Sequence, residues 1–171
     1  MGETVGLLKV TVVQGKQLVI RDFRTSDPYV VIKLGNQVAK TKVINNCLNP
    51  VWNEELTFCV TEPIGALNLE VFDKDTFKAD DKMGTAHLSL QQIASAARLK
   101  HVLKVSAGET RIRTIVPDSD NCLVRESYVS CVDGEVVQDV WLRLCGVESG
   151  ELELKLKWVD QHSSPLISAP K

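Results

Sequence analysis

The chain has 171 residues, of which 44% are hydrophobic and 25% are charged, and its formal net charge is −2. This length and composition are typical of a protein that buries its own core without disulfide or metal crosslinks. The slightly negative charge excludes a globally basic surface for nucleic acids, although a local basic patch is compatible with it. No apolar run approaches the roughly 20 residues that cross a bilayer, and the N-terminus lacks a signal-peptide pattern, so we expect a cytoplasmic or nuclear protein.

Strand patterns dominate the first half of the chain. Residues 6–13 (GLLKVTVV) and 29–34 (YVVIKL) are β-branched runs bounded by turn residues. Further strands are predicted at residues 37–43, 52–60 and 66–73. The spacing of about ten residues between strands is typical of an antiparallel sandwich.

The second half begins with one predicted helix. Ser89 can cap a helix over residues 90–99, in which one face is apolar: Leu90, Ile93, Ala94 and Ala97. Residues 110–116, 137–144 and 150–159 follow as strands. We expect one domain over residues 1–160 and a disordered tail over 161–171, which is rich in Ser and Pro.

The cysteines predict no covalent framework. The chain has five of them and no CxxC pair: Cys47, Cys59, Cys122, Cys131 and Cys145. An odd number without paired spacing favours free thiols over disulfides or a zinc site. We expect these side chains to be small buried hydrophobic groups.

Aspartates concentrate in two predicted loops. RDFRTSDPY supplies Asp22 and Asp27, and DKDTFKADDKMG supplies Asp73, Asp75, Asp80 and Asp81. Asp is common in turns, but so many carboxylates at one end of a sandwich repel one another unless a cation lies between them. Oxygen ligands on irregular loops favour calcium over magnesium, which demands octahedral geometry.

The segments SDPYV, KTKVINNCLNPVWNEELTF, LEVFDKD and DDKMG together resemble the C2 domain, and the resemblance extends over residues 6–160. It implies an all-β fold, an eight-stranded antiparallel C2 β-sandwich with one short helix. The opening strand leads directly into the first acidic loop and an additional strand ends the chain, which resembles the family's type II topology. Trp52 resembles the family's packing tryptophan and is expected in the core.

The resemblance also implies a calcium site. By motif, the carboxylate ligands are Asp22, Asp27, Asp73, Asp75 and Asp81, joined by the main-chain carbonyls of Arg21 and Lys74. Asp80 is an extra neighbour that could substitute for one of them. Ca²⁺ is therefore the expected cofactor.

A second set of residues predicts membrane contact. Two calcium ions would reverse the charge of loops that carry about as many bases as acids, and each positive charge near an anionic leaflet is worth ~1 kcal/mol. Phe23 and Phe77 lie mid-loop, where they either insert into the headgroups or anchor their loops. Lys33, Lys40 and Lys42 resemble a phosphoinositide-binding face of the family, or are a solubilising strand edge.

The chain departs from a compact C2 domain between its helix and its penultimate strand. An insertion at about residues 100–136 is rich in apolar residues that alternate in RIRTIV and NCLVRESYVSCV, which indicates order and an added strand pair. It resembles that of plant-specific small C2 proteins, described as mediators of abscisic acid signalling and activators of an unconventional G protein. Partner recognition around Asn121, Tyr128 and Val132 is implied, the alternative being a structural loop.

The sequence thus predicts a calcium-dependent phospholipid-binding adaptor on anionic membranes. By resemblance it recruits signalling partners (abscisic acid receptors, a G protein) and could stimulate a GTPase. The alternative is primarily a GTPase-activating protein, for which an arginine finger could come from Arg111, Arg113, Arg125 or Arg143. No nucleophile motif or phosphate loop accompanies the histidines, so we expect no enzyme. The expected location is the cytoplasm, with calcium-dependent association at the plasma membrane, or the nucleus.

Overall fold

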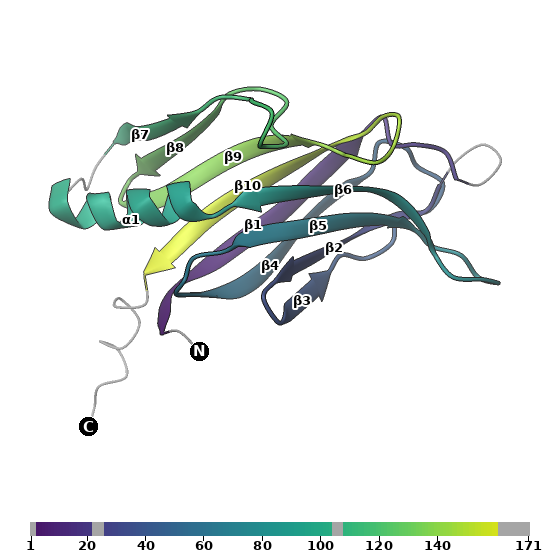
Figure 1. Ribbon diagram of the computed structural model, residues 1–171, viewed down its shortest axis with the longest axis horizontal. Coiled ribbons are helices and arrows are strands. Elements are labelled where there is room, and N and C mark those ends of the chain that lie inside the picture. Colours follow the sequence, from purple (N-terminus) through teal and green to yellow (C-terminus); the bar gives the residue numbers. More distant parts are fainter. Residues whose placement is uncertain (1–2, 22–25, 104–107, 161–171) are drawn as a thin grey trace.

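The computed structural model describes residues 3–21, 26–103 and 108–160. Two antiparallel sheets form a sandwich, and one helix lies at one end of it (Figure 1). The elements in chain order are β1 (Thr4–Lys16), β2 (Pro28–Leu34), β3 (Gln37–Lys40), β4 (Val51–Thr61), β5 (Ala66–Asp73), β6 (Asp81–Ser89), α1 (Gln91–Leu103), β7 (Glu109–Ile115), β8 (Ser127–Val132), β9 (Glu135–Arg143) and β10 (Glu151–Asp160).

The six-stranded sheet has the order β4-β1-β10-β9-β8-β7, and the four-stranded sheet has the order β3-β2-β5-β6. Alternating apolar residues of β1 and β2 face inward, so that Leu8, Val10 and Ile32 are fully buried between the sheets. The final strand β10 pairs with β1 along its length. The last strand of the chain therefore lies beside the first, as the type II expectation requires.

Helix α1 begins as the sequence predicts. Ser89 Oγ accepts a hydrogen bond from the backbone N–H of Gln91 at 3.2 Å. The predicted apolar face is buried, and α1 contacts β7, β8, β9 and β10. In the part of the chain that is described, no helix is long and apolar enough to cross a membrane.

The eight strands of the expected sandwich are β1–β6, β9 and β10, and the insertion adds the antiparallel pair β7 and β8 at one edge. β8 pairs with β9, so the insertion is ordered, as predicted. Leu123 and Val129 of the insertion are 3% and 0% exposed. Most of its apolar pattern therefore builds core rather than a free surface.

Two expectations about single side chains have different outcomes. Trp52 is buried, and its Nε1–H donates to the carbonyl oxygen of Lys42 at 3.0 Å. The expectation of buried cysteines is correct for Cys122 and Cys131 but wrong for Cys59 and Cys145, which are exposed. Cys59 lies on the outward-facing side of β4, and Cys145 follows β9 in a loop.

An acidic pair lies on the outer face of the six-stranded sheet. Partial desolvation of the Asp139 carboxyl, followed by repulsion from Glu153 and a hydrogen bond with it, raises the Asp139 pKa to about 6. Lys155 and Arg125 oppose this shift. Gln14 Nε2 donates to Glu153 Oε1 at 2.9 Å, which helps hold the second carboxylate in place.

We expect Asp139→Asn to raise the melting temperature at pH 7, because it removes a carboxylate whose ionisation the folded state disfavours. A folded-state pKa above the unfolded value of about 4 means that Asp139 contributes stability below pH ~4 and loses this contribution as pH rises through 6. The difference between wild type and Asp139→Asn should therefore shrink as pH falls from 7 to 4. Calorimetry across this range measures it, with Glu135→Gln on the same strand as the control; a constant difference would contradict the assignment.

Candidate functional site

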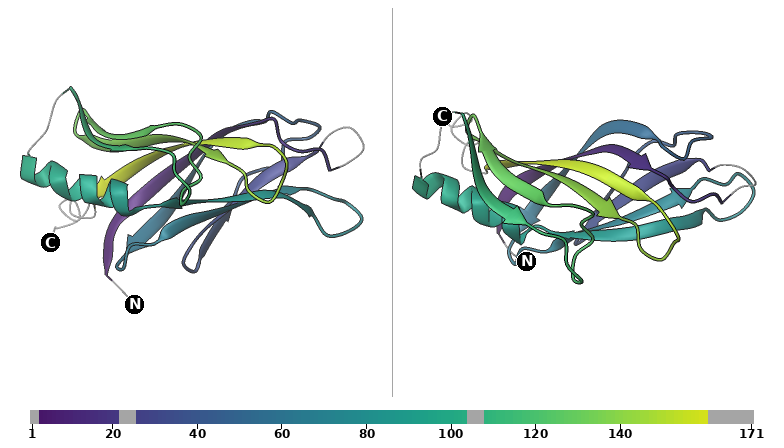
Figure 2. Two further views of the ribbon diagram at one scale, coloured as in Figure 1. Left: turned by 45° about the horizontal axis from the view of Figure 1, so that its top comes forward. Right: turned by 90° about the horizontal axis from the view of Figure 1, so that it is seen from above.

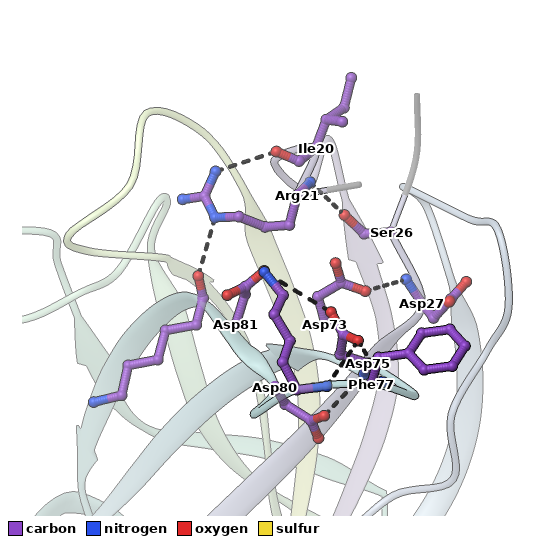
Figure 3. A network of polar contacts seen from close by, with 11 residues as sticks. Ile20, Arg21, Ser26, Asp27, Asp73, Asp75, Phe77, Asp80 and Asp81 are labelled. Atoms are coloured by element: carbon purple, nitrogen blue, oxygen red, sulfur yellow. Dashed lines mark hydrogen bonds and ion pairs between the residues drawn. The ribbon is translucent and has the colours of Figure 1, made fainter. Parts of the chain in front are cut away.

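The acidic tip is the end of the sandwich that carries Asp27, Asp73, Asp75 and Asp81. The loop between β5 and β6 projects at the opposite end from α1, and the described parts of the β1–β2 connection lie beside it (Figures 1 and 2). Side chains from both connections converge there (Figure 3). The sequence prediction that the two acidic loops share one end is correct for these four residues. Asp22 and Phe23 lie outside the described residues.

Asp27 and Asp73 are held together by strand pairing. β2 pairs with β5 so that Pro28 lies opposite Asp73. The backbone N–H of Asp27 donates to Asp73 Oδ1 at 2.9 Å, and that of Lys74 donates to the Asp27 carbonyl at 3.0 Å. Asp27 Oδ1 also accepts from the Asn46 backbone at 2.7 Å. Since Asp73 is only 1% exposed, this half of the tip is firmly positioned.

The side-chain ammonium of Lys78 lies between the carboxylates of Asp75 and Asp81. Lys78 Nζ lies 3.9 Å from Asp75 Oδ2 and 3.5 Å from Asp81 Oδ2. The backbone N–H groups of Phe77 and Lys78 donate to Asp75 Oδ1 at 2.9 and 3.3 Å, so the loop turns around this carboxylate. The ammonium therefore offsets the repulsion between two carboxylates that the sequence assigns to a metal.

Asp80, the extra neighbour of the predicted ligands, makes structural contacts within the tip. Its Oδ1 accepts from the Asp75 backbone at 2.8 Å, and its Oδ2 accepts a short hydrogen bond from the Tyr29 hydroxyl. The bond from Tyr29, then the one from Asp75, lowers the Asp80 pKa. Burial, then the bond to Asp80, raises the pKa of Tyr29 to about 12. Asp80 thus ties the loop to β2, where Tyr29 stacks on Phe72 at 5.6 Å.

Arg21 connects the first loop to β6. Its backbone N–H donates to Ser26 Oγ at 2.9 Å, and Ser26 Oγ donates to the Val19 carbonyl at 3.0 Å. The Arg21 side chain donates from Nε to the Lys82 carbonyl at 3.2 Å. These contacts fix the point at which the first loop leaves the body of the sandwich.

The donor chemistry fits a hard cation. The side chains assembled at the tip are carboxylates, and Lys78 already places a positive charge between two of them. Within the described residues, however, no three His, Cys, Asp or Glu side chains lie close enough together to hold a metal ion. A complete site therefore requires Asp75 and Asp81 to exchange their contacts with Lys78 for contacts with a metal.

The predicted lipid-contacting residues fall into two places. Phe77 projects from the acidic tip with 95% of its surface exposed, so the alternative of a buried anchor is wrong for this ring. Lys33 and Lys40 lie on the outer face of the four-stranded sheet, and Lys42 follows β3. Lys33 Nζ lies 3.5 Å from Glu70 Oε1, which neutralises part of this face.

The predicted partner-binding residues differ in their surroundings. Asn121 organises its own loop, since its side chain accepts from the Asp118 and Leu123 backbones and donates to the Val116 carbonyl. Tyr128 is 37% exposed, and the Arg111 guanidinium lies 3.6 Å from its ring centroid. Val132 is half-buried. Tyr128 is thus the one of the three with an outward-facing ring.

Comparison with known proteins gives this fold and tip a family. The C2 domain model matches residues 6–105. The chain belongs to the C2 domain family. The chain is 69% identical over 160 residues to the protein "C2-DOMAIN ABA-RELATED 11" of Arabidopsis thaliana, covering 94% of this chain and 96% of the relative. It is 46% identical over 160 residues to "GTPase activating protein 1" of Oryza sativa subsp. indica, covering 94% and 95%.

A solved structure supports the same fold. A calcium-bound structure of two C2 domains of extended synaptotagmin 2 matches with a TM-score of 0.65 and 25% identity, over 94% of this chain and 48% of that chain. The family model ends near the start of the insertion. The two relatives match over 160 of the 171 residues, so their alignments include the insertion. The insertion therefore belongs to this group of C2 proteins.

Two residues of the tip were not assigned their roles from sequence. Lys78 counted only as one of several loop bases, and Tyr29 only as part of SDPY. The signal for Lys78 was its position three residues from both Asp75 and Asp81. Nothing local in the sequence indicates that Tyr29 reaches Asp80, because 51 residues separate them.

Proposed function

We propose that this C2 domain protein is a calcium-dependent phospholipid-binding adaptor that carries signalling partners to anionic membranes. The observation that supports it best is the acidic tip, where Asp27, Asp73, Asp75 and Asp81 gather beside an exposed Phe77. The proposed location is the cytoplasmic face of the plasma membrane in the presence of calcium, with the cytoplasm or nucleus in its absence. We propose no catalytic activity of its own.

Calcium would bind through Asp22, Asp27, Asp73, Asp75 and Asp81, with the main-chain carbonyls of Arg21 and Lys74. When bound, calcium supplies positive charge that attracts anionic headgroups. Lys78 lies on the surface and contacts Asp75 and Asp81 at 3.9 and 3.5 Å. Exposed ion pairs of this kind are worth only about 0–1 kcal/mol, so a divalent ion can displace the ammonium.

Two surfaces would then meet the membrane. Phe77 is positioned to enter the headgroup region, since its ring projects from the tip. Lys33 and Lys40 on the outer face of the four-stranded sheet, with Lys42 after β3, supply basic groups for anionic or phosphoinositide headgroups. The pairing of Lys33 with Glu70 makes Lys40 and Lys42 the stronger candidates.

Partner recruitment is proposed for the insertion. α1 lies at the opposite end of the sandwich from the acidic tip. β7 and β8 lie over α1, away from the β5–β6 loop (Figure 2). Lipid and protein can therefore be bound at once, which raises the partner's effective concentration at the membrane. The names of the relatives support an abscisic acid receptor or a G protein as the partner.

Calcium should raise the melting temperature, because only the folded chain assembles the site. At free calcium a hundredfold above the dissociation constant, one site contributes about 2.7 kcal/mol. Lys78→Gln should tighten calcium binding severalfold by removing the competing ammonium, and Asp75→Asn should weaken it. Calorimetric titration tests both, with Lys82→Gln, which removes a lysine paired with Glu70, as the matched control. An equal melting temperature in chelator and in millimolar calcium would show that the tip is no calcium site.

Phe77→Ser should weaken calcium-dependent co-sedimentation with phosphatidylserine vesicles severalfold while leaving calcium-induced stabilisation unchanged. The reason is that the ring contributes apolar insertion and no metal ligand. Val102→Ser is the control, since Val102 is 74% exposed on α1, at the opposite end of the sandwich from the tip. If Phe77→Ser binds vesicles as wild type does, the ring lies outside the membrane contact.

A second candidate function is GTPase activation, favoured by the relative named "GTPase activating protein 1". Of the four candidate arginines, Arg113 is the least suitable finger because it donates to Ser95 Oγ of α1 at 2.6 Å. Arg111 and Arg125 lie over Tyr128 and Trp141. Arg143 is exposed at the end of β9.

The test is a GTP hydrolysis assay with an unconventional G protein and alanine variants of Arg111, Arg125 and Arg143. One of the three variants should lose the stimulation, because an arginine finger accelerates hydrolysis by on the order of 10³-fold. Arg113→Ala should instead lower the melting temperature by loosening α1. Vesicle binding of each variant serves as the control for folding. Stimulation that survives all three replacements would exclude an arginine finger from these positions.

A further inference from the structure

Two cysteines meet where three segments of the chain converge. The Cys122 carbonyl accepts from the Arg143 backbone at 2.7 Å, which joins the insertion to the end of β9. Cys145 exchanges backbone hydrogen bonds of 3.1 and 2.7 Å with Thr85 of β6. The insertion, the β9–β10 loop and β6 are therefore packed together around this pair.

The two thiols lie beside the same side of β6. Thr85 and His87 are two residues apart on this strand and project to one face. Cys145 pairs with Thr85, and Cys122 Sγ lies 3.5 Å from His87 Nδ1. The Cys145 side chain also contributes to raising the pKa of Cys122, as expected for two neighbouring thiols. Cys122 is 2% exposed, whereas Cys145 is exposed, so the pair has one thiol open to solvent and one protected.

His87 is oriented to accept a proton from Cys122. Its Nε2 lies 3.2 Å from the Asp120 carbonyl oxygen, which can only accept a hydrogen bond, so Nε2 carries the hydrogen. In the neutral ring Nδ1 is then an acceptor, and Nδ1 is the atom that faces Cys122 Sγ. His87, Asn121 and Cys122 also line a cavity of about 230 Å³.

We propose that Cys122 and Cys145 are a redox modification site that forms a reversible intramolecular disulfide with hydrogen peroxide as oxidant. Cys145 releases its proton to solvent, its thiolate attacks one peroxide oxygen, and the O–O bond breaks to give Cys145 sulfenic acid and hydroxide. The hydroxide takes up the released proton and becomes the first water. Cys122 sulfur then attacks the Cys145 sulfur and passes its proton to His87 Nδ1, and the S–O bond breaks. The departing hydroxide takes this proton. In total, two thiols and one peroxide give one disulfide and two waters.

The environment of each thiol matches its role. Burial, above all, raises the pKa of Cys122, as does the neighbouring Cys145, while a backbone hydrogen bond from His87 and the charge of Arg143 oppose this. Cys122 is thus kept as a thiol until a sulfenic acid forms next to it. Exposed Cys145 is the thiol that an oxidant in solution reaches first.

The bond would join parts of the molecule with different tasks. Cys122 belongs to the insertion, and Cys145 begins the loop in which Glu148 lies 3.9 Å from Arg21 at the acidic tip. A disulfide between them closes a loop that contains β8 and β9, and constrains the unfolded chain. Oxidation should therefore raise the melting temperature and fix the insertion loop against β9.

The test treats the full chain with hydrogen peroxide, blocks free thiols and maps peptides by mass spectrometry. We expect a Cys122–Cys145 crosslink, a loss of two hydrogen atoms from the intact monomer, and a higher melting temperature that dithiothreitol reverses. Cys145→Ser should form no such crosslink, and peroxide should not raise its melting temperature. Cys59→Ser, which removes another exposed thiol, should behave as wild type. His87→Asn should slow crosslinking on the order of tenfold or more, as loss of a positioned base does.

The proposal is overturned if peroxide converts Cys145 to sulfinic acid without a link to Cys122, or if crosslinks join separate molecules through Cys47 or Cys59. A crosslink that forms in His87→Asn at the wild-type rate would remove His87 from the mechanism. Cys145→Ser serves as the decisive variant because Cys145 is exposed and its replacement leaves the core intact. Its melting temperature without peroxide should equal that of the wild type.

Discussion

The pairing of β2 with β5 is the constraint on which the acidic tip depends. Its register sets Pro28 opposite Asp73, so that the Asp27 backbone reaches Asp73 Oδ1 and two loops far apart in sequence meet at one end. A slip by one residue would turn Asp73 to the other face and move Val30 and Ile32 out of the core. Burial of these apolar residues therefore fixes the positions of the carboxylates. The charge cluster is a consequence of core packing, and its repulsion has to be offset locally.

The ammonium of Lys78 offsets the repulsion between Asp75 and Asp81 through weak, exposed ion pairs. A buried counter-ion would hold the carboxylates in one arrangement, whereas an exposed ammonium gives a weak interaction on a flexible stem. The Tyr29–Asp80 contact holds the same loop from its other side without using the carboxylates of Asp75 and Asp81. The loop is thus anchored through one aspartate, while two others face the Lys78 ammonium. Neighbouring acids of one loop therefore have different tasks: Asp80 orders the loop, and Asp75 and Asp81 hold an exposed cation.

Motif and periodicity predicted the sandwich, the helix and the grouping of four aspartates because each rests on short-range pattern. β5 was predicted with its observed bounds, since its residues alternate without interruption. β6 was missed, because Gly84, with φ of 116°, interrupts the strand pattern and charged residues precede it. Lys78 as an internal cation and Tyr29 as partner of Asp80 were also missed, because side-chain contacts between loops leave no periodic signal. Whether Asp22 joins the tip stays a prediction, as residues 22–25 lie outside the description.

The insertion illustrates why an apolar pattern does not by itself identify a binding surface. Leu123, Val129 and Cys131 face the core, where they extend the six-stranded sheet's inner layer, so their replacement would damage folding before it affected recognition. What this region presents outward is different in kind: Arg111 lies over the Tyr128 ring, and Arg125 lies over the ring of Trp141 on β9. Tyr, Trp and Arg are the residues most enriched at the centres of protein interfaces. Because stacking orders these long side chains in advance, a partner that contacts them loses less conformational freedom on binding. Recognition by the insertion would thus rest on its arginine–aromatic pairs rather than on the hydrophobic residues that make it fold.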